Sequence, residues 1–228
     1  MHALLAHFGR MGFDGAPRPI GIDGDCELLT WIEGDAPGPD SPPPTGDEAV
    51  VALGRLLRRM HDAQAGFRPP PDAAWQRLPA AVGGSEVICH NDVLGTNVIV
   101  RGGLPIALVD WELAAPGPRL LDLATAASWW VPLRRPEGAI RWGLPLDRGE
   151  QRLRLLVDGY GLDAAGRREL PAMVVAVARS WYESYRIWGA AERRPRWAEW
   201  WDEGRGDILL AEARWLEELR PEVERWLR

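Results

Sequence analysis

The chain contains no lysine: all 27 of its basic residues are arginine, against 33 acidic residues. The formal net charge is therefore −6 at pH 7. Because binding to a phosphate backbone favours a basic surface, we do not expect nucleic acid among the partners of this protein.

Cysteine is scarce as well, with only Cys26 and Cys89 in 228 residues. Neither belongs to a Cys-x-x-Cys pair, and each lies in an apolar run. This pattern favours two buried free thiols in a reducing compartment over a disulfide or a metal site.

Long apolar segments are also missing. No run approaches the ~20 residues that a membrane span needs. The first residues, MHALLAHFGRMGF, do not combine a basic segment with a long apolar one, which argues against a signal peptide. We therefore expect a cytoplasmic protein without membrane contact, long enough to bury a core.

Hydrophobic periodicity and turn residues predict an α+β start, a connector and a mainly helical body. The expected elements are a helix over 2–11, strands over 20–22 and 26–32 joined across Asp23-Gly24, a Pro/Gly-rich connector over 33–44, and a helix from 45 to about 65. A loop over 66–84, a strand over 87–89 and a hairpin of 97–101 with 106–109 follow. Helices are expected near 119–131, 148–160, 167–191 and 207–227.

Two of these helices carry capping signals at their starts. Thr45 with Glu48 forms a capping box, and Asp147 with Glu150 forms a second capping pair. We expect these side chains to bind the free backbone N–H groups of the first turns.

The most informative stretch is residues 87–122. It contains His90, Asp92 and Asn97 in the spacing H-x-D-x-x-x-x-N, which is that of a kinase catalytic loop. Asp110 follows at the end of an apolar strand, where a kinase carries its metal-binding aspartate.

Phosphoryl transfer needs few protein groups, provided that they are well placed. Asp92 could orient an acceptor hydroxyl or amine and take its proton. Mg²⁺ prefers oxygen ligands, and Asn97 offers an amide oxygen while Asp110 offers a carboxylate. A hairpin between these two residues would bring them to the same end of a small sheet, so we expect the three groups to converge.

Two other interpretations fit the same residues. One is a surface turn, rich in Asn, Asp and Gly, between two buried strands. The other is a metal-dependent hydrolase that uses His90, Asp92 and Asp110. Hydrolase sites usually recruit more histidines, and this chain has four in total.

With the motif DWE at 110–112, this stretch resembles the aminoglycoside phosphotransferase and choline-kinase branch of the kinase-like fold, where the metal motif is often D-W-E or D-W-D. Three other segments are similar to segments of that family. They are LRRMH at 57–61, similar to an L-x-x-L-H helix, PRLLDLA at 118–124, similar to P-x-x-D-L-A, and LTWIEG at 29–34, similar to the hinge strand that supports adenine.

The resemblance implies an α+β, protein-kinase-like fold. Residues 1–34 would form a partial N-lobe and hinge, made of a helix and short strands. Residues 35–228 would form a mainly helical C-lobe with an embedded catalytic β-hairpin and the acceptor pocket.

The resemblance also implies roles for single residues. Asp92 would be the catalytic base, Asn97 and Asp110 the Mg²⁺ ligands, and His90 a brace for the loop. Asp122 would either accept hydrogen bonds from the catalytic-loop backbone or be an ordinary carboxylate in the first turn of a helix.

Other family positions carry weaker implications. Glu112 either shapes the metal shell or is solvated, and His61 is expected to be a packed histidine at a helix end. Main-chain groups of the hinge would meet the base of ATP or GTP; these residues are Thr30, Trp31, Ile32 and Glu33.

The resemblance is incomplete at the N-terminal end. The family's N-lobe has five strands, with a glycine-containing phosphate loop and a basic residue that faces the phosphates. Here no glycine-rich strand pair precedes residue 2, and the basic residues upstream of the hinge are Arg10 and Arg18. Either the start of the chain is set too late or the protein is a truncated relative, and in both cases we expect weak nucleotide binding.

The helical C-terminal part would supply the acceptor pocket. Residues 179–192 (RSWYESYRIWGAAE) place several aromatic side chains on one helix, and most of them are expected in the core. Trp181 and Tyr185, together with Glu183 or Asp158, would line a pocket for a cationic or sugar-like acceptor, because a carboxylate over an aromatic floor suits an ammonium group.

The sequence therefore predicts an ATP- and Mg²⁺-dependent phosphotransferase that acts on a hydroxyl of a small molecule. The alternative is a catalytically impaired kinase-like protein that binds a small molecule or a partner. The incomplete N-lobe favours this alternative, whereas the intact Asp92, Asn97 and Asp110 argue against it. Because a fold does not determine a substrate, the acceptor does not follow from the sequence.

Overall fold

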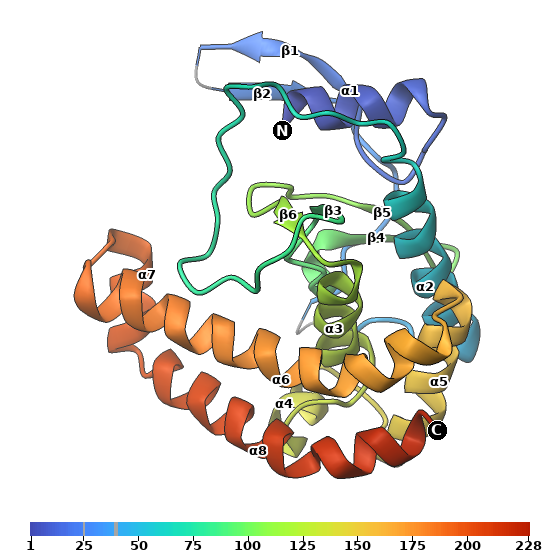
Figure 1. Cartoon of the computed structure of the whole chain (residues 1–228), viewed down its shortest axis with the longest axis vertical. Helices are drawn as coiled ribbons and strands as arrows, with labels where there is room; N and C mark the ends of the chain where they lie inside the picture. Colours follow the sequence, from blue (N-terminus) through green and yellow to red (C-terminus); the bar gives the residue numbers. More distant parts are fainter. Residues whose placement is uncertain (25, 39–40) are drawn as a thin grey trace.

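The structure is a computed structural model that describes residues 1–24, 26–38 and 41–228. In that part of the chain, a mainly helical body carries three two-stranded sheets. The N-terminal helix and hairpin lie together at one end of the molecule, above the helical body (Figure 1). This arrangement confirms the α+β fold class that the sequence predicted.

The N-terminal end consists of helix α1 (His2–Arg10) and the antiparallel hairpin of β1 (Pro19–Asp23) and β2 (Cys26–Leu29). The buried face of α1 presents Phe8, whose ring centroid lies 5.4 Å from that of Trp111. This aromatic contact joins the N-terminal end to the segment that carries the DWE motif.

Helices α2 (Asp47–Asp62) and α5 (Gly149–Tyr160) pack closely against each other. A Cβ atom at Gly54 would lie 2.3 Å from the carbonyl oxygen of Leu156, so the approach requires a residue without a side chain. The contact fixes the end of α2 that carries His61.

Two further strand pairs frame the catalytic segment. β3 (Val87–Cys89) pairs antiparallel with β6 (Ala115–Gly117), and β4 (Val98–Arg101) pairs antiparallel with β5 (Leu104–Leu108). A 3-10 turn over Gly95–Asn97 leads into β4.

The register of these pairs brings the motif residues together. Cys89, the last residue of β3, lies opposite Ala115, the first of β6. The N–H of Val109 donates a hydrogen bond of 2.9 Å to the carbonyl of Asn97. The loop that follows β3 therefore meets the segment that follows β5, as expected for a converging site.

The helical body is completed by α3 (Arg119–Trp130), α4 (Pro136–Arg141), α6 (Ala164–Tyr185), α7 (Pro195–Asp202) and α8 (Arg205–Trp226). A 3-10 turn over Leu146–Arg148 precedes α5, and a π-helical turn over Arg186–Ala191 continues α6. Helix α6 packs against both α8 and α3 (Figure 1). Among the described residues, none of the helices combines the length and the apolar character that a membrane span requires.

Most of the predicted helices and strands are present, but three short elements were not expected. β6 lies in a Pro/Gly-rich stretch for which the sequence predicted no strand, and among the described residues it pairs with β3. Helices α4 and α7 both begin with proline and span too few residues to show a clear apolar period. Short elements of this kind depend on tertiary contacts more than on local pattern.

The two predicted capping boxes are wrong. The N-cap residue of α2 is Gly46 and that of α5 is Arg148, and neither helix start has a side-chain cap bond. Asp47 instead binds the guanidinium of Arg148 at 2.6 Å, which joins the two helix starts to each other. Glu150, one of the expected capping residues, pairs instead with Arg154 on its own helix, at 3.0 Å.

The prediction that both cysteines are buried holds for Cys89 alone. Cys26 is exposed, because all four residues of its strand β2 are exposed.

Asp25, which follows the predicted hairpin turn, and residues 39–40 of the predicted connector lie outside the described residues. Asp35, in the same connector, exchanges two backbone hydrogen bonds with Val100 of β4, at 2.8 and 2.7 Å.

Candidate active site

The loop between β3 and β4 is held by one buried carboxylate. Asp122, in the first turn of α3, has no exposed surface and accepts three hydrogen bonds. The backbone N–H groups of His90 and Asn91 donate to it at 3.0 and 2.8 Å, and Nε2 of His61 donates at 3.0 Å. The expected hydrogen bonds from the loop backbone are therefore present.

His61 extends this network to a second helix. Its Nε2–H donates to the carboxylate of Asp122, so Nδ1 is left to accept the hydroxyl proton of Tyr160, at 2.8 Å. Tyr160 closes α5, and the histidine is 1% exposed. His61 is packed at a helix end, as expected, but it also connects α2, α3 and α5.

His90 is fully buried against the DWE motif. Its Nε2–H donates to the carbonyl of Val109 at 2.9 Å, and its Nδ1 accepts the N–H of Asp92 at 3.3 Å. The imidazole meets the ring of Trp111 edge-on, at 4.6 Å between centroids. Burial lowers the pKa of His90, so the ring is neutral, and both nitrogens are occupied.

This geometry argues against the metal-dependent hydrolase. A histidine ligates a metal through a ring nitrogen with a free lone pair. His90 has none, because one nitrogen donates to a carbonyl and the other accepts from the backbone. Within the described residues there is also no cluster of three or more His, Cys, Asp and Glu side chains that could hold a metal ion.

Two non-glycine residues of the site have left-handed backbone conformations. Asn91 has φ 66° and Asp110 has φ 61°. Such conformations are uncommon for residues with a side chain and persist where the surroundings fix them. Asn91 is fixed by its side-chain amide, which donates to the carbonyl of Leu113 at 2.7 Å.

The side chains of Asp92 and Asn97 form a buried pair. The amide nitrogen of Asn97 donates to the carbonyl and to Oδ2 of Asp92, at 3.0 and 2.9 Å. The other carboxylate oxygen of Asp92, Oδ1, is buried without a hydrogen-bond partner among the described residues. One oxygen of the predicted catalytic base is thus uncommitted.

The electrostatic surroundings of Asp92 favour its protonated form. Burial and the negative charges of Asp110 and Glu112 together raise the pKa of Asp92 to about 7, against the opposing effect of the hydrogen bond from Asn97. Unlike the buried Asp92, both Asp110 and Glu112 are exposed.

The oxygen atoms of this site fit a magnesium ion. Because the amide nitrogen of Asn97 is committed to Asp92, its Oδ1 faces elsewhere and meets only the hydroxyl of Thr96, at 3.4 Å. The carboxylate of Asp110 is exposed, and its negative charge acts on Asp92. A hard cation prefers this set of amide and carboxylate oxygens, with phosphate oxygens and water completing its shell.

A cavity of about 360 Å³ opens beside Asp92. This volume suits a small molecule. Side chains from α3, α6, α7 and α8 line it together with the DWE segment; they include Glu112, Trp129, Arg134, Trp181, Tyr185, Trp197, Trp200, Arg205 and Glu212. Of the predicted pocket residues, Trp181 and Tyr185 are therefore in place.

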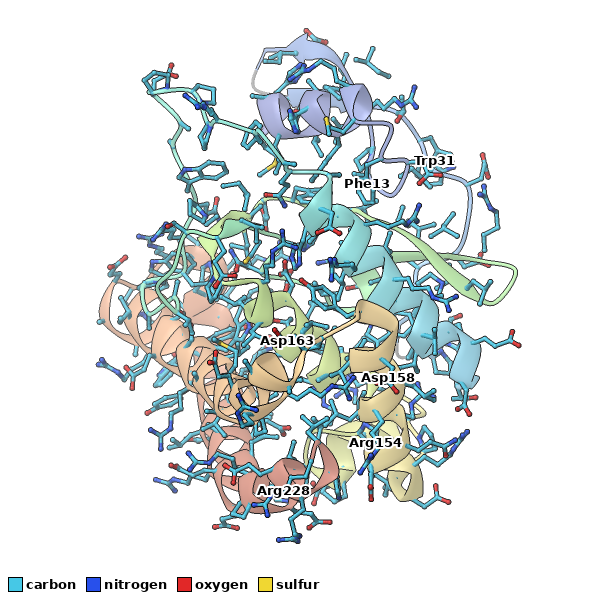
Figure 2. The ribbon with its side chains drawn as sticks, turned by 45° about the vertical axis from the view of Figure 1, so that its right-hand side comes forward. Phe13, Trp31, Arg154, Asp158, Asp163 and Arg228 are labelled. Carbon is cyan, nitrogen blue, oxygen red and sulfur yellow. The ribbon has the colours of Figure 1, made fainter. Side chains whose placement is uncertain are left out.

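The other two predicted pocket residues do not line this cavity. Asp158 lies on α5, where it forms an ion pair with Arg167 at 2.5 Å, and Figure 2 shows it among the outer side chains of that helix. Glu183 forms an ion pair with Arg186 at 2.7 Å. Each faces a neighbouring arginine on the surface, because its position on the helix points away from the cavity.

The sequence analysis missed most of the cavity wall. Trp197 and Trp200 come from α7, which was not expected as a helix, and Arg134 follows α3 in an irregular segment. The clustering of tryptophan in RWAEWW, residues 196–201, was the available signal for an aromatic wall.

The predicted hinge residues follow β2 in irregular structure. Thr30 is tied to Arg18 by two hydrogen bonds of 2.9 Å, one from its N–H and one to its hydroxyl oxygen. Trp31 is 80% exposed and projects from the N-terminal part of the molecule (Figure 2). The contact of residues 30–33 with a nucleotide base stays a prediction.

A family model matches the part of the chain that carries these residues. Residues 70–156, which include the catalytic loop and the DWE motif, match the model of the phosphotransferase enzyme family, APH. This part of the chain is therefore similar to that phosphotransferase family. The trifolitoxin immunity protein of Rhizobium leguminosarum bv. trifolii is 37% identical over 171 residues, which cover 72% of this chain and 64% of that protein. The chain thus spans less than two thirds of this relative.

Solved structures of phosphotransferases and kinases share the fold. A choline/ethanolamine kinase family protein from Mesorhizobium loti matches with a TM-score of 0.61 at 16% identity, over 99% of this chain and 80% of that one. A Plasmodium vivax ethanolamine kinase gives 0.57 at 12% identity, over 92% and 70%. A macrolide 2'-phosphotransferase from Brachybacterium faecium gives 0.55 at 15% identity, over 87% and 76%. The chain therefore has the kinase-like fold of these structures.

The raised pKa of Asp92 predicts a stability cost at neutral pH. The pKa of Asp92 is about 7 in the folded protein and 3.8 in the unfolded chain. Folding therefore favours the protonated carboxyl group, and the free energy of unfolding falls as the pH rises from 3.8 to about 7. At about 1.36 kcal/mol per pKa unit the cost is at most ~4 kcal/mol, and we expect about 2 kcal/mol. Asp92→Asn should therefore be more stable than the wild type at pH 8, with a smaller difference at pH 4.5.

Urea unfolding of both proteins at the two pH values, with a chelator present, measures this difference. An equal difference at pH 4.5 and pH 8 would contradict the account, because a group that does not change its pKa on folding adds no pH dependence.

Proposed function

We propose that this protein transfers the γ-phosphate of ATP to a hydroxyl group of a small molecule bound in the cavity, and that it depends on Mg²⁺. The observation that carries the proposal is the position of Asp92: a buried carboxylate that lines the cavity, with one oxygen that has no hydrogen-bond partner among the described residues. The family match of residues 70–156 supports the reaction class.

The chemistry asks little of the protein beyond placement. The acceptor hydroxyl would give its proton to Oδ1 of Asp92 as its oxygen bonds to the γ-phosphorus. The bond from that phosphorus to the bridging oxygen breaks, and ADP leaves. Bound Mg²⁺, held by Asn97 and Asp110, would offset the negative charge of the phosphates.

The protein groups around Asp92 suit this role. Asn97 holds Oδ2, so the carboxylate keeps one orientation and presents Oδ1. A proton acceptor works best with a pKa near the working pH, and the pKa of Asp92 is about 7. Negative charge from Asp110 contributes to that value, so a cation at Asp110 would lower it and favour the ionised base.

Asp92→Asn should abolish transfer. We expect formation of phosphorylated product to fall by about 10²- to 10⁴-fold, because the variant retains the shape of the site but cannot take the proton. Mass spectrometry of a library of small hydroxylated compounds, incubated with Mg·ATP and each protein, detects the product. Asp158→Asn is the matched control, since that carboxylate is exposed and does not line the cavity.

Full activity in Asp92→Asn would contradict the role of this residue. If the wild type yields no product from any compound, the proposed activity is wrong. The remaining interpretation would then be a catalytically impaired relative that binds a small molecule or a partner.

A second proposal concerns the purpose of the transfer. The relative with 37% identity is named for immunity to trifolitoxin, which suggests a protective role for this chain as well. Expression in a trifolitoxin-sensitive strain should raise the inhibitory dose, and Asp92→Asn should not. Equal protection by the variant would show that immunity does not depend on phosphoryl transfer. If neither protein protects the strain, the proposed protective role is wrong.

A further inference from the structure

One arginine in the wall of the cavity has no carboxylate partner. Arg134 lines the cavity in the segment after α3, and its Nε and Nη1 are buried without a hydrogen-bond partner in the part of the chain that the structure describes. The guanidinium stacks on the ring of Trp129 at 4.1 Å. Aromatic stacking orients the group but does not pair its N–H donors.

The second arginine of the cavity is different. Arg205 also stacks on a tryptophan, Trp200, at 4.8 Å. Its Nε donates to a carboxylate oxygen of Glu203 at 3.2 Å, so its charge is paired within the protein. Arg134 is therefore the cavity arginine with charge available for a ligand.

The nearest compensating charge does not satisfy Arg134 directly. Glu212 also lines the cavity, but its Oε1 accepts the backbone N–H of Arg135 at 3.0 Å. No ion pair within 4.0 Å joins Glu212 to Arg134 among the described residues. Burial lowers the pKa of Arg134 and raises that of Glu212, so each remains partly uncompensated.

A buried charge without a partner destabilises a fold, so a protein retains one where a ligand completes it. The planar guanidinium matches a carboxylate, which can accept two parallel N–H bonds. The rest of the cavity wall is largely aromatic and aliphatic, with Trp181 and Trp197 among its members. Such a wall suits an apolar body.

We propose that the acceptor is a hydroxylated carboxylate. Arg134 binds its carboxylate group, the aromatic wall holds its body, and its hydroxyl lies at Asp92. The proposal rests on the function proposed above and adds the chemical class of the acceptor. It differs from the cationic acceptor expected from the sequence: Asp158 and Glu183, the carboxylates of that expectation, do not line the cavity, although Glu112 and Glu212 do.

Binding of matched compounds tests this proposal without nucleotide. The compounds are used in sets of three that share an apolar body and a hydroxyl group. Within a set, one compound carries a carboxylate, one a carboxamide and one an amine. One such set is 4-(hydroxymethyl)benzoate, 4-(hydroxymethyl)benzamide and 4-(hydroxymethyl)benzylamine. Titration followed by ligand-observed NMR gives the three affinities. The acid should bind about 10-fold or more tightly than the amide and the amine.

Variants identify the group responsible. Arg134→Gln should remove the preference for the acid, and Arg134→Lys should restore part of it. Arg196→Gln is the matched control: Arg196 also stacks on Trp200, at 4.7 Å, but it is exposed and does not line the cavity. This variant should keep the full preference.

Thermal unfolding separates ligand binding from a structural role. If Arg134 is held for a ligand, Arg134→Met should unfold at the same temperature as the wild type or higher, because an unpaired buried charge is removed. A marked loss of stability in this variant would instead make Arg134 a structural partner of Glu212 and overturn the proposal.

Each result separates the two proposals. Equal binding within every set, a preference for the amine, or no binding of any acid overturns the carboxylate acceptor, even if phosphate transfer to other compounds is found. Selective binding of the acid that depends on Arg134, without any transfer, keeps the carboxylate site and overturns the phosphotransferase.

Discussion

The arrangement of the active site depends on the buried carboxylate of Asp122. It accepts hydrogen bonds from the backbone of His90 and Asn91 and from the ring of His61, and so joins α3 to the catalytic loop and to α2. A buried carboxylate costs free energy unless its oxygens are paired, and three donors pair these two oxygens. Since the N–H groups of His90 and Asn91 have their acceptor there, the loop has one low-energy conformation, and Asp92 is carried to the edge of the cavity.

Two ionisable side chains that line the cavity lack a full set of hydrogen-bond partners among the described residues. Asp92 has an unpaired oxygen and a pKa of about 7, and Arg134 has unpaired nitrogens. Both groups reduce the stability of the ligand-free protein, and both are suited to pair with groups of a bound ligand. This is the usual relation between a binding site and the stability of the protein that contains it. A hydroxyl and a carboxylate on one apolar body would complete both groups at once.

The grouping of the motif residues could be predicted from the sequence, and the residues of the cavity wall for the most part could not. His90, Asp92, Asn97 and Asp110 lie on a short hairpin-linked segment whose spacing is imposed by the reaction, so their order in the chain carries their geometry. The cavity wall comes from four helices, of which α3 is distant in sequence from the other three, and no spacing relates Trp129 to Glu212. Asp158 and Glu183 were chosen because they lie near aromatic residues in the sequence, but their helices turn them toward arginines on the surface. The expected caps are not formed either: Gly46 and Arg148 are the N-cap residues, and Glu150 pairs with Arg154 on its own helix.

The central claim is that Asp122 holds the catalytic loop in its active shape, and amide hydrogen exchange in Asp122→Asn tests it most directly. The account predicts that exchange at His90 and Asn91 becomes faster by about 10-fold or more, because their acceptor is weakened, while α6 and α8 exchange as in the wild type. Unchanged exchange at these two amides would contradict the claim, because the loop would then keep its shape without this carboxylate. Equal acceleration throughout the chain would also contradict it, since the residue would then support the whole fold and not the loop in particular.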